Sequence, residues 1–333
     1  MRLDAALAVD SLADVPAAAA AAEAIGFDAV WSSETQHDPF LPLALVAVHS
    51  TRLKLGTAIA VAFARSPTAV AHAARDLAAA SGGRFLLGLG TQVRPHIERR
   101  FGMPWPAAPA KVIREYILAL RAIWHTWQTG EPLAFRGDTY RLTLMSPFFN
   151  PGPIEHPDIP IYLAAVNPGM VRLAGEVADG VHAHPLHSAE YLRQVVRPAL
   201  RDAAERAGRD PRQISLSVSV FTASDEAEAE FVRSQIAFYA STPSYRLVPE
   251  MHGWAERAER LGALARRGRW SEMAEVVDDD MLRTYAVVAA PEDLGAALRQ
   301  RYAGLADRLT LYLPFRPGDR DRFWQRLVRD LAG

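Results

Sequence analysis

The chain has 333 residues, of which 50% are hydrophobic and 23% charged, so it can bury a sizeable core. Its 37 basic and 38 acidic residues leave a net charge of −1, which gives no electrostatic case for binding nucleic acid or an anionic membrane. The lack of cysteine excludes disulfides, thiolate metal sites and cysteine nucleophiles. Asp4, Asp10 and Asp14 interrupt the first apolar residues, so no signal peptide is recognised and we expect a cytoplasmic protein.

Strands and helices alternate along the chain. The apolar runs predict eight strands, over 3–9, 27–33, 53–61, 85–89, 161–166, 181–184, 214–222 and 309–313. Helices with short connections separate them, which is typical of right-handed crossovers in a parallel sheet. Together with the length, this pattern predicts a single (β/α)8 TIM-barrel domain over 1–333.

Two segments interrupt the alternation. Residues 94–110 follow the fourth strand and contain four prolines, so we expect a packed loop over the barrel mouth. A helix over 111–128 and a hairpin turn over 135–140 follow this loop. Residues 225–281 are mostly helical and polar, and we interpret them as an insertion between the seventh and eighth strands.

Catalytic groups of a TIM barrel lie on the loops after the strands. This rule selects Glu34, Thr35, Gln36, His37, Thr57, the Ala58–Ile59 peptide, Thr91, Gln92, Asn167, Gly169, Met170, His184 and His187. His37 is the acid/base candidate because its ordinary pKa lies near neutrality. It could equally be structural, and Glu34 could hold His37, contact a ligand or cap the backbone.

Two further patterns allow different chemistry. Asn167-Pro168-Gly169-Met170 has the layout of an anion site at a helix N-terminus, or of an ordinary N-cap. His182 and His184 have the spacing of one metal-binding pattern, but the last strand ends in Tyr312 without a carboxylate, and we expect no metal. No nucleotide-binding loop and no hydrolase nucleophile motif is found.

Four stretches resemble the bacterial-luciferase-like superfamily: GFDAVW at 26–31, LGTAI at 55–59, SGGRFLLGLG at 81–90 and ADG at 178–180. Three more resemble an actinobacterial branch usually assigned the deazaflavin coenzyme F420: AVAFARSP at 60–67, HIERRFGMPW at 96–105 and QIAFYASTP at 235–243. The resemblance implies a barrel that holds a flavin or deazaflavin ring at its mouth. It also implies a non-proline cis peptide at Ala58–Ile59 beneath the ring, and a homodimer.

The resemblance assigns site residues as well. The catalytic candidates come from the loop after the second strand itself: His37 would orient or protonate the substrate, and Glu34 would lie near the ring. The cofactor-binding residues would be Glu34, Thr57, Ala58, Ile59, Val61, Thr91, Gln92, His96, Val166, Asn167, Gly169 and Met170. The substrate, a small organic molecule, would contact Trp31, Arg94, His184 and His187.

The chain departs from related enzymes at two positions. Thr35, not histidine, follows Glu34, and Val93 stands where relatives often have an acid. The first hypothesis is an F420-dependent oxidoreductase that transfers a hydride. The two departures concern the residues that would transfer a proton in related enzymes, not the hydride step. The alternatives are an FMN-dependent monooxygenase, a cofactor-binding barrel without turnover, and a metal hydrolase.

Overall fold

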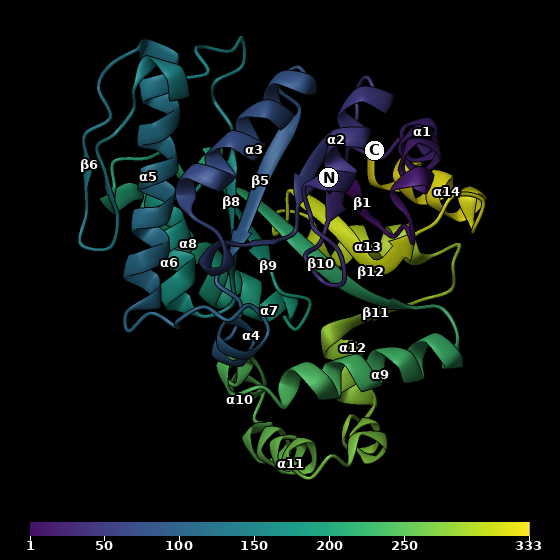
Figure 1. Ribbon diagram of the computed structural model, residues 1–333. Coiled ribbons are helices and arrows are strands. Elements are labelled where there is room, and N and C mark those ends of the chain that lie inside the picture. The colour runs from purple at the N-terminus through teal and green to yellow at the C-terminus, as the bar shows by residue number, and fades with distance from the viewer. Residues whose placement is uncertain (333) are drawn as a thin grey trace.

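The computed structural model describes residues 1–332, in which eight parallel strands close into a barrel (Figure 1). They are β1 (Arg2–Leu7), β2 (Ala29–Ser32), β3 (Lys54–Thr57), β5 (Phe85–Gly90), β8 (Ile161–Ala165), β9 (Gly180–Ala183), β10 (Ser215–Ala223) and β12 (Arg308–Phe315). Each strand pairs with the next in this order, and β12 pairs with β1. The predicted TIM barrel is confirmed.

Helices surround the barrel and bury their apolar faces on the strands. They are α1 (Val15–Ile25), α2 (Leu41–His49), α3 (Pro67–Ala80), α5 (Pro109–Thr129), α6 (Pro168–Val177), α8 (Arg197–Arg206), α13 (Leu294–Tyr302) and α14 (Asp321–Ala332). Local sequence sets their ends: Gly26 closes α1 at φ 100°, and the Ser66 hydroxyl accepts the Ala69 N–H at the start of α3. Within the described chain, no helix is long and apolar enough to cross a membrane.

The third predicted strand is divided. β3 ends at Thr57, and the chain pairs with β5 again over β4 (Ala60–Val61). The Ala58–Ile59 peptide between them is cis, as the resemblance implied. The strand is therefore interrupted over 57–59, where its pairing with β5 stops, and it resumes at Ala60.

The segment after β5 is only partly irregular. It contains the short helix α4 (Arg94–Arg99), in which Pro95 occupies the first turn. The hairpin expected near 135–140 is present as β6 (Phe135–Arg136) and β7 (Arg141–Leu142).

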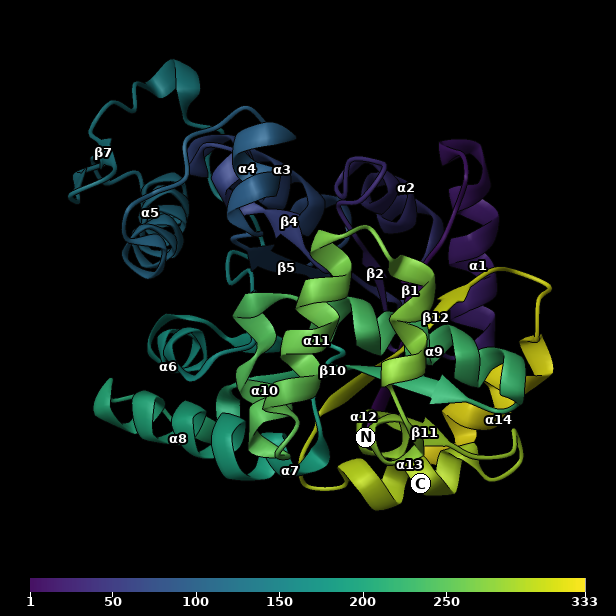
Figure 2. The same cartoon turned by 90° about the horizontal axis from the view of Figure 1, so that it is seen from below.

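Helices follow β10, as predicted for the second insertion: α9 (Glu226–Ala240), α10 (Leu247–Met251), α11 (Ala255–Arg266) and α12 (Asp279–Tyr285). Figures 1 and 2 show α9, α10 and α11 grouped at one end of the barrel. One strand was not predicted: β11 (Ala286–Val288) pairs in parallel with the end of β10. Its three residues directly follow a helix and are too few to show strand alternation.

A buried ion pair closes the opposite end of the barrel. Arg308 is 1% exposed, and its Nε and Nη2 each donate to Asp4 at 2.7 Å. Arg308 also donates to Asp28 at 2.5 Å, and Trp31 Nε1 donates to Asp4 at 2.8 Å. Burial alone would lower the pKa of Arg308, but the two carboxylates outweigh it and raise that pKa.

Candidate active site

The Ala58–Ile59 bulge is held by the end of β2. The Ala58 N–H donates to the Ser32 carbonyl at 2.8 Å, and the Glu34 N–H donates to the Ile59 carbonyl at 3.3 Å. Both sides of the cis peptide are therefore bonded to β2 and the loop that follows it, while β4 pairs with β5. This arrangement places a shaped backbone surface at the mouth of the barrel.

Glu34 supports the bulge with its side chain as well. The carboxylate is 8% exposed and accepts the Val61 N–H at 2.7 Å. Arg65 Nη1 lies 2.7 and 2.6 Å from its two oxygens, and Arg65 Nη2 donates to Asp38 at 2.9 Å. Burial opposes the charge of Arg65, but hydrogen bonds to the two carboxylates raise its pKa. Glu34 thus caps the backbone and does not hold His37, and Arg65 is a site residue that the sequence analysis missed.

In the described residues, His37 makes no hydrogen bond to this carboxylate, whose partners are Val61 and Arg65. The His37 side chain is exposed, and its charge adds to that of Arg316 in lowering the pKa of Asp10, where the hydrogen bond from Arg316 is the main cause. The loop after β1 therefore comes close to His37. The acid/base role of His37 stays a prediction.

The Thr57 side chain forms hydrogen bonds between β3 and β5. It is fully buried, and its hydroxyl donates to the Gly88 carbonyl at 2.6 Å and accepts the Gly88 N–H at 2.9 Å. A Cβ at Gly88 would lie 1.8 Å from the Thr57 carbonyl oxygen, so only glycine allows this approach. A contact between the Thr57 side chain and a cofactor is not supported by this geometry.

The polar groups of the turn after β5 form hydrogen bonds with one another. Thr91 and Gln92 are half-buried; the Thr91 hydroxyl donates to the Gln92 carbonyl, and Gln92 Oε1 accepts the Val93 N–H. Gln92 adopts φ 59°, a left-handed conformation that is uncommon outside glycine. It turns the chain from β5 into α4.

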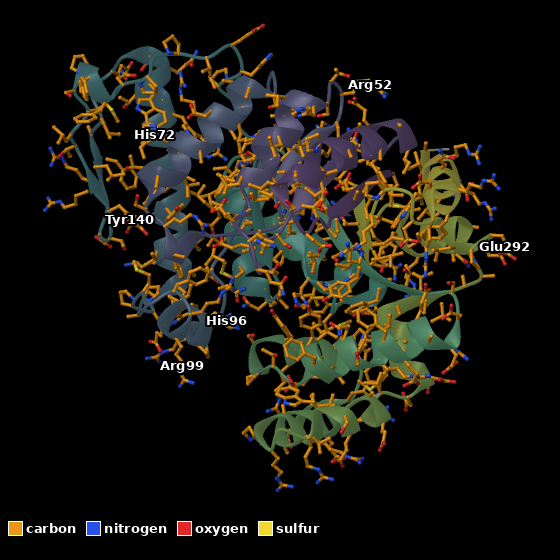
Figure 3. All side chains as sticks on the ribbon, turned by 45° about the vertical axis from the view of Figure 1, so that its right-hand side comes forward. Arg52, His72, His96, Arg99, Tyr140 and Glu292 are labelled. Atoms are coloured by element: carbon orange, nitrogen blue, oxygen red, sulfur yellow. The ribbon has the colours of Figure 1, made fainter. Side chains whose placement is uncertain are left out.

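The α4 side chains predicted to contact ligands are exposed. Arg94 forms an ion pair with Glu98 at 2.8 Å, and His96 is solvent-exposed. Figure 3 shows His96 and Arg99 at the outside of the molecule. Among the hydrogen bonds of residues 1–332, none joins Arg94 or His96 to the Ala58–Ile59 peptide.

The first turn of α6 is an N-cap that remains open to ligands. Asn167 Oδ1 accepts the Met170 N–H at 3.0 Å, as the capping interpretation predicts. A Cβ at Gly169 would meet only Asn167 Oδ1, at 3.2 Å, and Asn167 and Gly169 are exposed. Pro168 has no N–H, and the Met170 and Val171 N–H groups both donate to Asn167, so the Gly169 N–H is the donor of this turn that can receive an anion. The Val166 carbonyl is occupied by the Tyr191 hydroxyl at 2.7 Å.

Two of the expected substrate residues lie inside the fold. Trp31 is 3% exposed, and its Nε1–H donates a hydrogen bond to Asp4. His187 is 2% exposed, and its nitrogens contact the His184 carbonyl at 2.9 Å and the Tyr302 hydroxyl at 3.0 Å. Burial lowers the pKa of His187 to about 4. Direct substrate contacts from Trp31 and His187 are therefore not supported, because both side chains are enclosed and already bonded.

His184 remains at the mouth, whereas His182 points into the barrel. A Cβ at Gly88 would come within 2.9 Å of His182 Nε2, and burial lowers the pKa of His182 to about 3. Among residues 1–332, no three histidine, aspartate or glutamate side chains are grouped closely enough to bind a metal ion. The His182–His184 pattern thus gains no further ligand for a hydrolytic metal.

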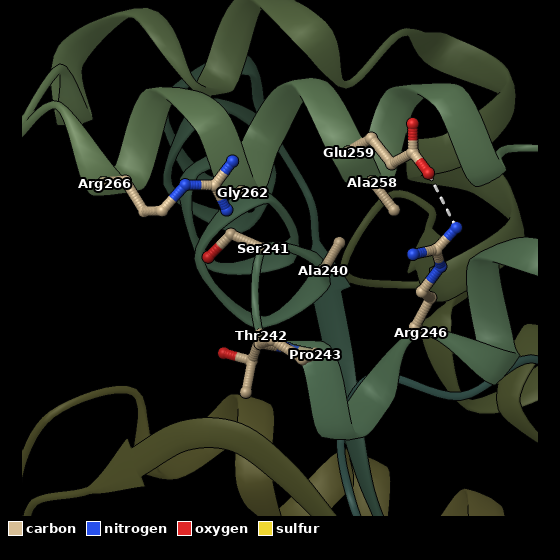
Figure 4. Close-up of a pocket in the computed structure, with 9 residues that line it drawn as sticks. All are labelled: Ala240, Ser241, Thr242, Pro243, Arg246, Ala258, Glu259, Gly262 and Arg266. Atoms are coloured by element: carbon tan, nitrogen blue, oxygen red, sulfur yellow. Dashed lines mark hydrogen bonds and ion pairs between the residues drawn. The ribbon is translucent and has the colours of Figure 1, made fainter. Parts of the chain in front are cut away.

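One cavity of the structure lies away from these strand ends. It has a volume of about 300 Å³ and lies between the C-terminus of α9 and α11 (Figure 4). Its charged lining residues are Arg246, Glu259 and Arg266, and Arg246 is paired with Glu259 at 2.8 Å. None of the predicted site residues lines it. We therefore place the candidate site by its chemistry, at the bulge and the first turn of α6.

The barrel and its strand-end bulge define the class of protein. Residues 2–308 match the family described as luciferase-like monooxygenase, and the chain belongs to that family. Its members include oxidoreductases and monooxygenases.

Two relatives and one solved structure are similar to most of this chain. An uncharacterized protein of Mycobacterium tuberculosis is 47% identical over 306 residues, which cover 90% of each chain. A putative coenzyme F420-dependent oxidoreductase of Mycobacterium tuberculosis is 32% identical over 288 residues, covering 81% of this chain and 82% of its own. The structure of the coenzyme F420-dependent tetrahydromethanopterin reductase from Methanopyrus kandleri matches with a TM-score of 0.80 and 22% identity, covering 99% of this chain and 98% of that one.

Proposed function

We propose that the protein is an F420-dependent oxidoreductase that transfers a hydride between the deazaflavin and a small organic substrate. The named relative that carries this proposal is described as F420-dependent and covers most of the chain. When bound, the deazaflavin ring supplies the site that accepts or donates the hydride. The protein's part is to bind this ring, orient the substrate and exclude water.

The observation that best supports a bound ring is the fixed bulge at Ala58–Ile59. Glu34 holds it through one backbone and one side-chain hydrogen bond, at Ile59 and Val61. Gly90 lies next to it: a Cβ there would come 2.7 Å from Ile59 Cδ1. A flat ring needs a rigid, close backbone surface of this kind, and the Ile59 side chain against Gly90 would shape it.

The first turn of α6 is the proposed binding place for the phosphate-bearing part of the cofactor. β8 is adjacent to β5 in the barrel, and α6 begins directly after β8, so its open first turn lies at the same end as the bulge. Asn167 and Gly169 would receive a phosphate oxygen there, as helix N-termini do for anions. Val166 and Met170, both half-buried, would flank it.

Fluorescence titration of the purified protein with F420 and with FMN tests the proposal. We expect F420 to bind with a Kd of about 1 μM or below and FMN at least about tenfold more weakly, which corresponds to a difference above ~1.4 kcal/mol. FMN remains the runner-up because the family is described as monooxygenases. Tighter binding of FMN, or no binding of F420, would contradict the proposal.

A glycine pair provides variants for this titration. G90A would displace Ile59 and is expected to weaken F420 binding at least about tenfold. G262A lies in α11, where the new Cβ meets its neighbours only at 3.4 and 3.5 Å, and should leave binding unchanged. Equal affinities of the two variants would place the cofactor elsewhere.

Turnover and assembly are separate parts of the proposal. A barrel that binds F420 but does not turn over would show wild-type affinity and no F420 reduction or oxidation across a substrate panel. The resemblance also leads us to propose a homodimer. Light scattering during size-exclusion chromatography would distinguish a dimer from the 36.5 kDa monomer.

A further inference from the structure

Aromatic side chains from three strand ends and the insertion meet around His184. The His184 ring lies 4.4 Å from the Tyr239 ring, edge to face, and 4.3 Å from the Tyr245 ring, at an interplanar angle of 30°. Tyr312 lies 4.8 Å from Phe221, and both approach Tyr239. We call His184, Phe221, Tyr239, Tyr245 and Tyr312 the aromatic wall.

The wall stands at the barrel mouth. His184 directly follows β9, Phe221 lies near the end of β10, and Tyr312 lies in the second half of β12. Tyr239 belongs to α9, and Tyr245 precedes α10, so the insertion completes the wall. All members except Phe221 are half-buried, so each keeps part of its surface that the protein does not cover.

The hydrogen bonds fix the tautomer of His184. Its Nδ1 accepts the Leu186 N–H at 3.1 Å, so the neutral ring carries its proton on Nε2. Within residues 1–332, neither His184 Nε2 nor the Tyr245 hydroxyl makes a hydrogen bond. The Tyr239 and Tyr312 hydroxyls, by contrast, bond to each other at 2.8 Å, and Tyr312 also donates to Gln235. The wall thus leaves one fixed N–H donor and one hydroxyl available.

His184, Tyr239 and Tyr245 are uncharged at neutral pH. Burial, followed by the proximity of His187, lowers the pKa of His184 to about 3. Burial raises the pKa of Tyr245, and burial followed by Tyr312 and Tyr245 raises that of Tyr239. No lysine, arginine or carboxylate contributes to any of these shifts.

We infer that the aromatic wall is the substrate subsite and that it binds an uncharged carbonyl compound or alcohol, whose oxygen accepts the Nε2–H of His184. This inference rests on the proposed function, because it concerns the molecule that exchanges the hydride. Aromatic faces favour the apolar body of such a molecule. A carboxylate or phosphate would be desolvated here without a cationic partner, at a cost of several kcal/mol.

A matched pair of probes tests the inference: cyclohexanone and 4-oxocyclohexanecarboxylate, which differ by one carboxylate. Binding is followed through the histidine ring signals in NMR spectra, with and without F420. We expect cyclohexanone to shift the His184 signals saturably and the carboxylate to bind at least tenfold more weakly. In H184F, which keeps a ring but lacks the donor, cyclohexanone affinity should fall about tenfold.

The control is H72F, because His72 is also stacked on an aromatic ring, Trp127 at 4.6 Å, but lies on the outer helix α3. It should bind cyclohexanone as the wild type does. Equal or tighter binding of the carboxylate, unmoved His184 signals, or unchanged affinity in H184F would overturn the subsite. If F420 binds and the ketone does not, only the subsite fails; if the ketone binds and F420 does not, the proposed function fails and the subsite stands.

Discussion

The two ends of the barrel use polar residues in opposite ways. At the closed end, Arg308 is enclosed by Asp4 and Asp28, and Trp31 completes the hydrogen bonds of Asp4. At the open end, the first turn of α6 and His184 Nε2 keep hydrogen-bonding capacity that the protein itself does not use.

This difference separates stability from function. A buried charge without its partner is strongly destabilising, so the closed end can tolerate few changes. Unpaired donors at a half-buried surface are instead ready for a ligand. Glu34 and Arg65 lie between these extremes, since they are fully paired but hold the bulge on which the proposed cofactor would rest.

The largest effect is expected at the closed end. D4A leaves Arg308 buried with one carboxylate fewer and should lower the free energy of unfolding by about 3–5 kcal/mol, measured by urea denaturation. The matched control is D10A, which removes the carboxylate of an exposed pair with Arg316 and should have no measurable effect. A small loss in D4A would mean that the closed end does not support the fold.

Lowering the pH should destabilise the protein through His187. Its pKa is about 4 in the folded state and about 6.5 when unfolded, so the unfolded chain binds more protons between these values. The contribution is complete above pH 6.5 and is lost as the pH falls toward 4, by up to about 3 kcal/mol. In H187F, urea midpoints should depend less on pH over this window. An unchanged pH slope would contradict the buried, neutral state of His187.

Glu34 should couple stability to cofactor binding. E34A leaves the Val61 N–H without its acceptor, and we expect a loss of about 2 kcal/mol in stability together with at least tenfold weaker F420 binding. E34Q keeps an acceptor oxygen and should recover most of the affinity. If E34A lost stability but bound F420 normally, the bulge would not be part of the site.

The smallest effect is expected at the cavity beside α11. G262A adds a methyl group within ordinary contact distance and removes a helical glycine, so the protein should be stabilised by up to about 1 kcal/mol. Calorimetry gives the change in Tm. Weaker F420 binding in this variant would indicate that the cavity, not the bulge, receives the cofactor.

Local patterns predicted the barrel because strand and helix periods repeat within short windows. Local patterns did not predict β11, because its three residues pair with β10 only through the position that the preceding helix α12 gives them in the fold. The capping of α6 by Asn167 was visible in four consecutive residues.

The other roles at the site depend on contacts between residues far apart in the sequence. Arg65 reaches Glu34 across 31 positions, and His187 reaches Tyr302 across 115, so neither role could be read from spacing. The strand-end rule selected His187 by its position after β9 but could not show that its ring is buried against Tyr302. The aromatic wall depends on Tyr239 and Tyr245, which belong to an insertion whose position the sequence does not define.

Hydrogen–deuterium exchange of the wild-type protein, with and without saturating F420, tests the central claim most directly. We predict that F420 slows exchange of the backbone amides over 57–61 and 167–171, and leaves those over 240–266 unchanged. Protection centred on 240–266, or no protection at 57–61, would contradict the assignment of the bulge and the first turn of α6 as the cofactor site.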